Sequence, residues 1–158
     1  MKSSTVISTV IWLLLFAGFT WMIDRALNPN KAETLGNGKT VVLQRDPSGH
    51  YRAEAFINGV KVEVLVDTGA TGVAISQRLA DSLGIESRAA IRTNTANGEV
   101  VGYMARLSSV RLGGIEARDV TATIAPGLEG EALLGMSFLN RMDVRLYHGT
   151  MTIRQVSE

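Results

Sequence analysis

One acidic residue follows directly on an apolar run that is predicted to be a strand. The run Val64-Leu65-Val66 precedes Asp67, and the small residues Thr68-Gly69-Ala70 follow it before a second apolar run begins at Val73. Burying an ionised carboxylate at such a strand end costs several kcal/mol unless it is paired or hydrogen-bonded. Asp67 is therefore a candidate for acid–base chemistry, and the alternative is a turn in which it bonds the backbone two residues on.

Other residue types that could carry chemistry are scarce. The chain has no cysteine, which excludes thiolate catalysis, disulfides and cysteine-bound zinc. Its two histidines, His50 and His148, stand beside glycines in predicted turns and lack metal-ligand spacing, so we expect neither a metal nor a cofactor. Asp119 could be a second carboxylate, but no glycine follows it and it lies in a strand-like run, which predicts a surface position.

Composition limits the protein to a few classes. The 158 residues are 46% hydrophobic and 20% charged, which fits one folded domain plus an appendage and excludes a multidomain enzyme. The net charge is only +1, so no basic surface for nucleic acid is predicted.

The N-terminal segment 1–23 is predicted to be a transmembrane anchor. No residue from Ser3 to Ile23 is charged, and about 20 such residues span a bilayer as a helix. A cleaved signal peptide is the alternative, but small residues do not follow the apolar run as a cleavage site requires. A buried core helix is a third possibility, although the segment has no polar face. The short tail before the helix favours a cytoplasmic N-terminus with the domain outside.

The remaining chain divides into a flexible tether over residues 24–39 and an all-β domain over residues 40–158. Turn signals recur at short intervals with β-branched runs between them, which is typical of an all-β domain. Tyr51–Ile57 and Val60–Val66 are expected to form a hairpin across Asn58-Gly59, a type I′ turn sequence. A second hairpin is predicted at the C-terminus around His148-Gly149.

Two short helices are predicted within this domain. The first covers Gln77–Leu83, with Ser76 as its N-cap and Gly84 as its stop signal, and the second follows Gly135. The two halves of the chain share no repeated motif, so the chain supplies one copy of Asp67 and its loop.

Three motifs in order resemble those of the single-domain, retropepsin-like aspartic proteases. Asp67-Thr68-Gly69-Ala70 between apolar runs resembles their active-site loop, and Leu133-Leu134-Gly135 resembles the element that packs beneath it. The segment Thr95–Glu99, with Ala96, Asn97 and Gly98 at its tip, resembles their flap hairpin. Anchor, tether and domain together resemble the membrane-anchored retropepsin-like proteases of Gram-negative bacteria.

The resemblance implies a closed retropepsin-like β-barrel with one or two short helices, preceded by one transmembrane helix. It implies a homodimeric endopeptidase in which two Asp67 carboxylates, one per subunit, activate a water against a peptide substrate, without cofactor or nucleic acid. Thr68 would bond across the dimer, and Ala96, Asn97 and Gly98 would close over the substrate. The implied location is the bacterial inner membrane, with the domain in the periplasm. The alternative is an inactive peptide-binding or envelope assembly module of the same fold.

Overall fold

Strands make up most of the folded part of the chain. The computed structural model describes residues 3–27, 33–34, 39–87, 89–95 and 98–156. In these ranges the strands form two sheets, and the three helices are α1, α2 and α3. The all-β domain predicted from the sequence is confirmed.

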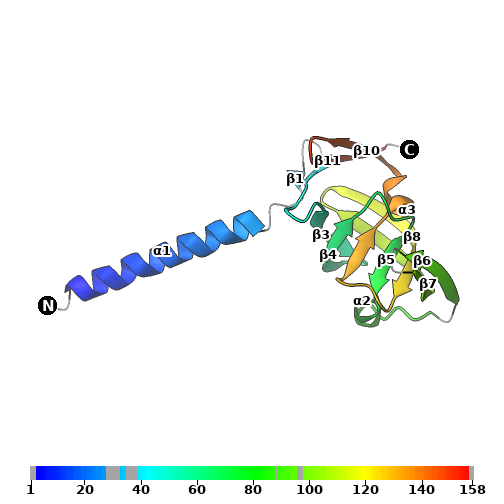
Figure 1. Ribbon diagram of the computed structural model, residues 1–158, viewed down its shortest axis with the longest axis horizontal. Coiled ribbons are helices and arrows are strands. Elements are labelled where there is room, and N and C mark those ends of the chain that lie inside the picture. The colour runs from blue at the N-terminus through cyan, green and yellow to red at the C-terminus, as the bar shows by residue number, and fades with distance from the viewer. Residues whose placement is uncertain (1–2, 28–32, 35–38, 88, 96–97, 157–158) are drawn as a thin grey trace.

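Six strands close into a barrel (Figure 1). In the order in which they pair, they are β3 (Tyr51–Ile57), β4 (Val60–Val66), β9 (Ala132–Leu134), β5 (Val73–Ser76), β8 (Ile115–Ala125) and β7 (Gly98–Leu112). The ring closes where β7 pairs with β3, from Val110 opposite Ile57 to Leu112 opposite Ala55. The closed barrel expected from the resemblance is confirmed.

Side chains alternate between the barrel interior and its outer face. In β4, Val62, Val64 and Val66 are buried, and the residues between them are half-buried or exposed. Because successive side chains of a strand point to opposite faces, Asp67 shares the outer face with Leu65. The hydrophobic pattern of β4 therefore determines that Asp67 points away from the barrel core.

The hairpin of β3 and β4 has the predicted bounds and turn. Asn58 and Gly59 have φ values of 49° and 84°, the left-handed conformations that a type I′ turn requires. The Asn58 N–H donates to Ser109 O at 3.0 Å, and Asn58 Oδ1 accepts from Ser109 N–H at 3.2 Å. The turn thus bonds to β7 beside the point where the barrel closes.

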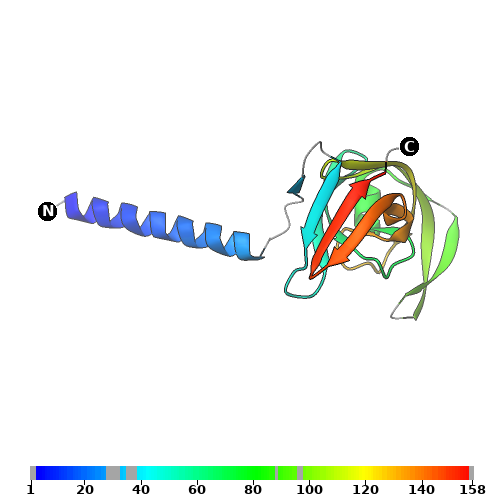
Figure 2. The ribbon, with the colours of Figure 1, turned by 90° about the horizontal axis from the view of Figure 1, so that it is seen from above.

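A second hairpin projects from the barrel (Figure 2). It joins β6 (Ala90–Thr95) to the first part of β7, with Thr95 opposite Gly98. The pairing predicted for this segment is confirmed over its described residues, whereas Ala96 and Asn97 lie outside them. Its role as a flap stays a prediction.

The two short helices lie where the sequence predicts them. Helix α2 (Gln77–Ser82) follows Ser76, whose Oγ accepts the Leu79 N–H at 3.2 Å, and it ends before Gly84. Helix α3 (Met136–Leu139) follows Gly135 and buries Phe138 in the core.

Segments from both ends of the domain form the second sheet, which Figure 1 shows above the barrel. Its order is β1 (Glu33–Thr34), β2 (Thr40–Gln44), β11 (Thr150–Gln155) and β10 (Met142–Tyr147). The hairpin of β10 and β11 was predicted, but the position of β2 beside β11 was not. Val41 and Leu43 of β2 and Met151 and Ile153 of β11 are buried, so this sheet extends the core.

The N-terminal helix α1 (Ser3–Leu27) continues past Ile23, and β1 lies within the predicted tether. Every α1 side chain that the structure describes, from Ile7 to Ile23, is exposed. Within the described residues, no helix combines the length and hydropathy needed to span a membrane. Membrane attachment through residues 1–23 stays a prediction.

Candidate active site

Asp67 stands immediately after β4, at the edge of the outer face of the barrel. Its N–H donates to Leu134 O at 3.0 Å, which continues the parallel pairing of β4 with β9 by one residue. Asp67 is half-buried, and Thr68 and Gly69 are exposed. The strand end therefore presents a carboxylate and a small-residue loop at the surface of this chain.

Hydrogen bonds within the loop fix the orientation of the carboxylate. Asp67 Oδ1 accepts the Gly69 N–H at 2.8 Å, and Asp67 O accepts the Ala70 N–H at 3.4 Å. This is the turn that the residue types of Asp67 and Gly69 allow. Among the described residues Oδ2 has no hydrogen-bond partner, so one carboxylate oxygen is available to a ligand.

Gly135 forms the support beneath the loop. A Cβ added at Gly135 would lie 2.6 Å from Ala70 O and closer still to Gly72 O, contacts that a side chain cannot make. The residue that follows, Met136, donates its N–H to Ala70 O at 2.8 Å. The structure thus brings the predicted elements Leu133-Leu134-Gly135 and Asp67-Thr68-Gly69-Ala70 into direct contact.

Ser137 also holds the loop, and sequence reasoning did not identify it. Its N–H donates to Thr71 O at 3.0 Å, and its Oγ accepts the Val73 N–H at 3.1 Å. Two backbone groups of the loop are thereby satisfied by one residue of α3. Its position at the start of a predicted helix, directly after Gly135 and Met136, was the one feature of the sequence that could have indicated this role.

An apolar row crosses the outer face beside Asp67. Leu65 pairs with Leu133, and Leu133 pairs with Ala74. The row then passes through Thr123 to Met104. Leu65, Leu133, Ala74 and Thr123 are half-buried, and Met104 is exposed. An extended chain lying beside Asp67 would contact an uncharged wall.

The other aspartates whose side chains the structure describes are bonded elsewhere. Asp46 pairs with Arg52, Asp81 accepts from Gln77, Asp119 pairs with Arg106, and Asp143 pairs with Arg154. Asp119 is exposed, as predicted, and its hydrogen bond with Arg106 holds the pKa of its carboxyl below the usual value. Asp119 is therefore engaged in an ion pair with Arg106 at the surface.

Metal-ligating side chains do not cluster in the described part of the chain. No group of three or more histidine, aspartate and glutamate side chains there could hold a metal ion. Asp67 offers an oriented carboxylate, a group that can accept or donate a proton.

Comparison with known proteins agrees with this geometry. Residues 53–141, more than half of the chain, match the family model of the gag-polyprotein putative aspartyl protease. The chain belongs to this family. The matched segment contains both Asp67 and Gly135, and the fold of this aspartic protease family member is retropepsin-like.

Bacterial relatives of this family member extend the comparison. A crystal structure of a retropepsin-like aspartic protease from Rickettsia conorii is 30% identical, with a TM-score of 0.63 over 73% of this chain and 90% of that chain. An uncharacterized protein from the cobV 5′ region of a Sinorhizobium species is 29% identical over 88% of this chain, and one from Rickettsia prowazekii is 30% identical over 84%. The chain spans only 63% and 62% of the length of these two curated relatives.

We predict that Gly135→Ala destabilises the domain and that Gly72→Ala does not. The new methyl group at position 135 would meet backbone oxygens, which cannot move away as a flexible side chain can, so we expect a loss of about 2–3 kcal/mol in the free energy of unfolding. A Cβ at Gly72 meets no atom within 4 Å, so its variant should stay within about 0.5 kcal/mol of the parent. Urea unfolding of the three proteins measures both. Equal stability of the two variants would contradict the support assigned to Gly135.

Proposed function

We propose that this protein is a homodimeric aspartic endopeptidase whose active site contains one Asp67 from each subunit. The observation that carries the proposal is the oriented carboxylate of Asp67 on the Gly135 support, in a chain of the aspartic protease family. One such carboxylate is half of the required pair. Two carboxylates about 3 Å apart cannot both ionise, so they would share one proton.

The shared proton permits a complete catalytic cycle. The ionised Asp67 takes a proton from water as the water oxygen attacks the carbonyl carbon of the peptide bond, and the protonated Asp67 of the other subunit gives its proton to the carbonyl oxygen. The resulting diol then returns a proton to that second carboxylate. The first gives its proton to the amide nitrogen, the C–N bond breaks, and the pair regains its starting state.

The surroundings of Asp67 favour an extended peptide as substrate. Leu65, Leu133 and Ala74 form the uncharged wall beside it, and the hairpin of β6 and β7 projects from the same barrel. Peptides that bind in extended form use their main chain for affinity and alternate side chains for specificity. We therefore expect apolar side chains next to the cleaved bond.

We predict that Asp67→Asn abolishes peptide cleavage while leaving the fold intact. Asparagine keeps the shape of the side chain and an acceptor for the Gly69 N–H, but it cannot carry the shared proton. The measurement is cleavage of a mixed peptide library by mass spectrometry, with circular dichroism as the check on folding. Asp81→Asn is the matched control, because Asp81 is exposed on α2, and it should cleave like the parent. Cleavage by a folded Asp67→Asn protein would place the chemistry elsewhere.

Dimerisation would complete the site that one chain leaves open. Thr68 and Gly69 are exposed beside Asp67, where a second copy would cover them. Strand β10 is an edge of its sheet and carries the exposed side chains Leu146 and Tyr147. Such edges readily pair with another chain. The loop and β10 are the surfaces that we assign to the contact between subunits.

We predict that specific activity falls as the protein is diluted. Only the dimer would hold the proton-sharing pair, so the active fraction follows mass action. Activity measured at a series of protein concentrations, together with sedimentation of the same samples, tests this. A monomer with full specific activity at nanomolar concentration would show that a single chain suffices.

We also propose that residues 1–23 attach the protein to the bacterial inner membrane, with the protease domain in the periplasm. The support is the uncharged stretch from Ser3 to Ile23 and the exposure of its large side chains, including Trp12 at 70% and Phe16 at 68%. Exposed apolar surface of this extent requires a partner, and lipid can surround a helix that is uncharged on all its faces.

We predict that the full-length chain stays in the membrane fraction after alkaline carbonate extraction. Removal of residues 2–23 should release it, because the rest of the surface carries no comparable apolar segment among the described residues. Protease digestion of spheroplasts should reach the domain without lysis. Recovery of the intact full-length chain in the soluble fraction would exclude the anchor, and protection of the domain would reverse its orientation.

A further inference from the structure

We propose that an open edge of β7, between Tyr103 and Val110, binds an extended segment of the protein substrate that lies outside the catalytic cleft. The proposal rests on the function proposed above, since it assigns a second contact to the same substrate. It concerns a different surface from Asp67 and its loop.

The strand neighbours of β7 leave this edge uncovered. On the side away from β8, β6 pairs with β7 as far as Ala90 opposite Tyr103. On the same side β3 begins to pair only at Ile57 opposite Val110. Between these points no strand among the described residues covers the edge, while β8 pairs with the opposite edge.

The backbone of Arg106 is directed to this open edge. The Met104 N–H donates to Ala89 O at 2.9 Å, so the polar groups of Met104 point away from β8. Polar groups alternate in direction along a strand, which directs the Arg106 N–H and C=O to the same side. Continuing the pairing would require Ser87 opposite Arg106, and no hydrogen bond joins them in the described structure. A donor and an acceptor are thus available to an added strand.

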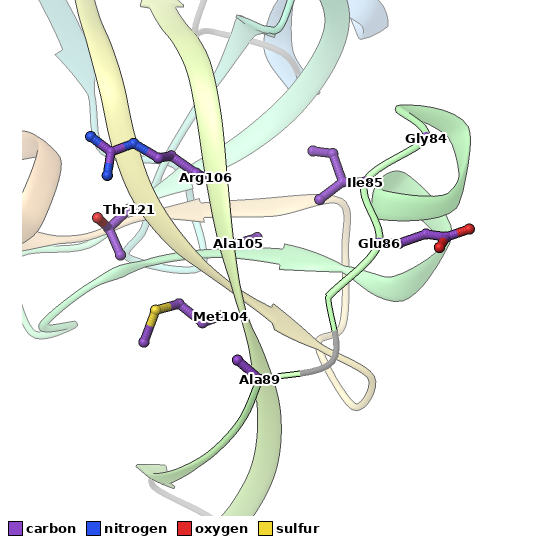
Figure 3. A pocket seen from close by; sticks show the side chains of 8 residues that line it. All are labelled: Gly84, Ile85, Glu86, Ala89, Met104, Ala105, Arg106 and Thr121. Carbon is purple, nitrogen blue, oxygen red and sulfur yellow. The ribbon is translucent and has the colours of Figure 1, made fainter.

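A hollow of about 460 Å³ lies beside this edge, beneath the segment that links α2 to β6. Figure 3 shows Ile85 directed toward β7 and Glu86 directed away from it. Met104 and Ala89 also line the hollow, and Met104 is 49% exposed. The hollow therefore suits an apolar side chain on the strand that the edge binds.

The arginine beside the hollow already has a partner. Arg106 Nε and Nη2 bond the two carboxylate oxygens of Asp119, each at 2.5 Å. Because the carboxylate of Asp119 already binds this guanidinium in a bidentate manner, Arg106 would bind a phosphate or an acidic side chain only weakly. Glu86 also lines the hollow and would repel an acidic group. We therefore assign an extended peptide without acidic side chains to this edge.

The edge is continuous with the uncharged wall beside Asp67, so we infer that the bound peptide is part of the substrate. Met104 pairs with Thr123, which pairs with Ala74, which pairs with Leu133 beside the active-site loop. Three strand spacings separate Leu133 from Met104, or about 14 Å. An extended chain covers that distance in about four residues. The second contact therefore involves residues at least that far from the cleaved bond.

The test compares a short and a long version of one cleaved peptide. The short version carries three residues on each side of the bond, and the long version adds a flank of alternating valine and threonine on both sides. We expect the wild-type protein to favour the long peptide in kcat/KM by about tenfold, mainly through KM, as two or so added hydrogen bonds and one buried side chain allow. Equal values for the two peptides would overturn the proposal.

Two substitutions of one residue separate the backbone from the side chain. Arg106→Pro removes the N–H at the open edge and loses no bond to β8, whereas Arg106→Ala removes the ion pair with Asp119 and keeps the N–H. We expect the ratio of kcat/KM for the long peptide to that for the short one to fall to about one in Arg106→Pro and to persist in Arg106→Ala. The same ratio in both variants would exclude backbone pairing at this edge.

Two further measurements test the edge if Arg106→Pro misfolds or if the protein cleaves neither peptide. With the unaltered protein, a long peptide whose flanks are N-methylated should have the same kcat/KM as the short peptide, because its own N–H donors are removed. A kcat/KM that stays about tenfold higher would overturn the proposal. If neither peptide is cleaved, the protease assignment fails by itself. In that case, fluorescence anisotropy of the labelled long peptide with the Asp67→Asn protein tests binding at the edge. Saturable binding that flank methylation weakens would support the proposal, and no binding would overturn it.

Discussion

The close approach of Gly135 to the loop that follows Asp67 is the contact on which the rest of the site depends. No side chain fits between Gly135 and the oxygens of Ala70 and Gly72, so the two segments lie backbone against backbone. Met136 and Ser137 then use their N–H groups to bind the loop, and Leu134 O accepts the N–H of Asp67. The direction of the carboxylate is consequently set by backbone geometry, which few side-chain changes would alter.

Two strand edges of the domain lack a neighbouring strand among the described residues, one in each sheet. Alternation along β4 directs Asp67 outward, away from the barrel core. Strand β10 is a sheet edge, and β7 lacks a strand neighbour between Tyr103 and Val110. Unpaired strand edges can bind another chain, which fits a second copy at β10 and a peptide at β7.

Local signals in the sequence predicted the elements that local chemistry controls. Asn58-Gly59 defined its hairpin because left-handed φ values are limited to few residue types, and Ser76 defined the start of α2 through its hydroxyl. Long-range pairing was not predictable in this way. Strand β2 bonds β11 across most of the domain, and the open edge of β7 exists only because β6 and β3 end where they do. The role of Ser137 likewise depends on a contact with Val73, far away in the sequence.

Subunit mixing tests whether two Asp67 side chains from two chains form one active site. Wild-type and Asp67→Asn proteins are mixed at constant total concentration, allowed to exchange subunits, and assayed for peptide cleavage. If both carboxylates are required, activity follows the square of the wild-type fraction, so an equal mixture retains about one quarter of full activity. Activity proportional to the wild-type fraction, with about one half retained in the equal mixture, would show that one Asp67 is sufficient for cleavage.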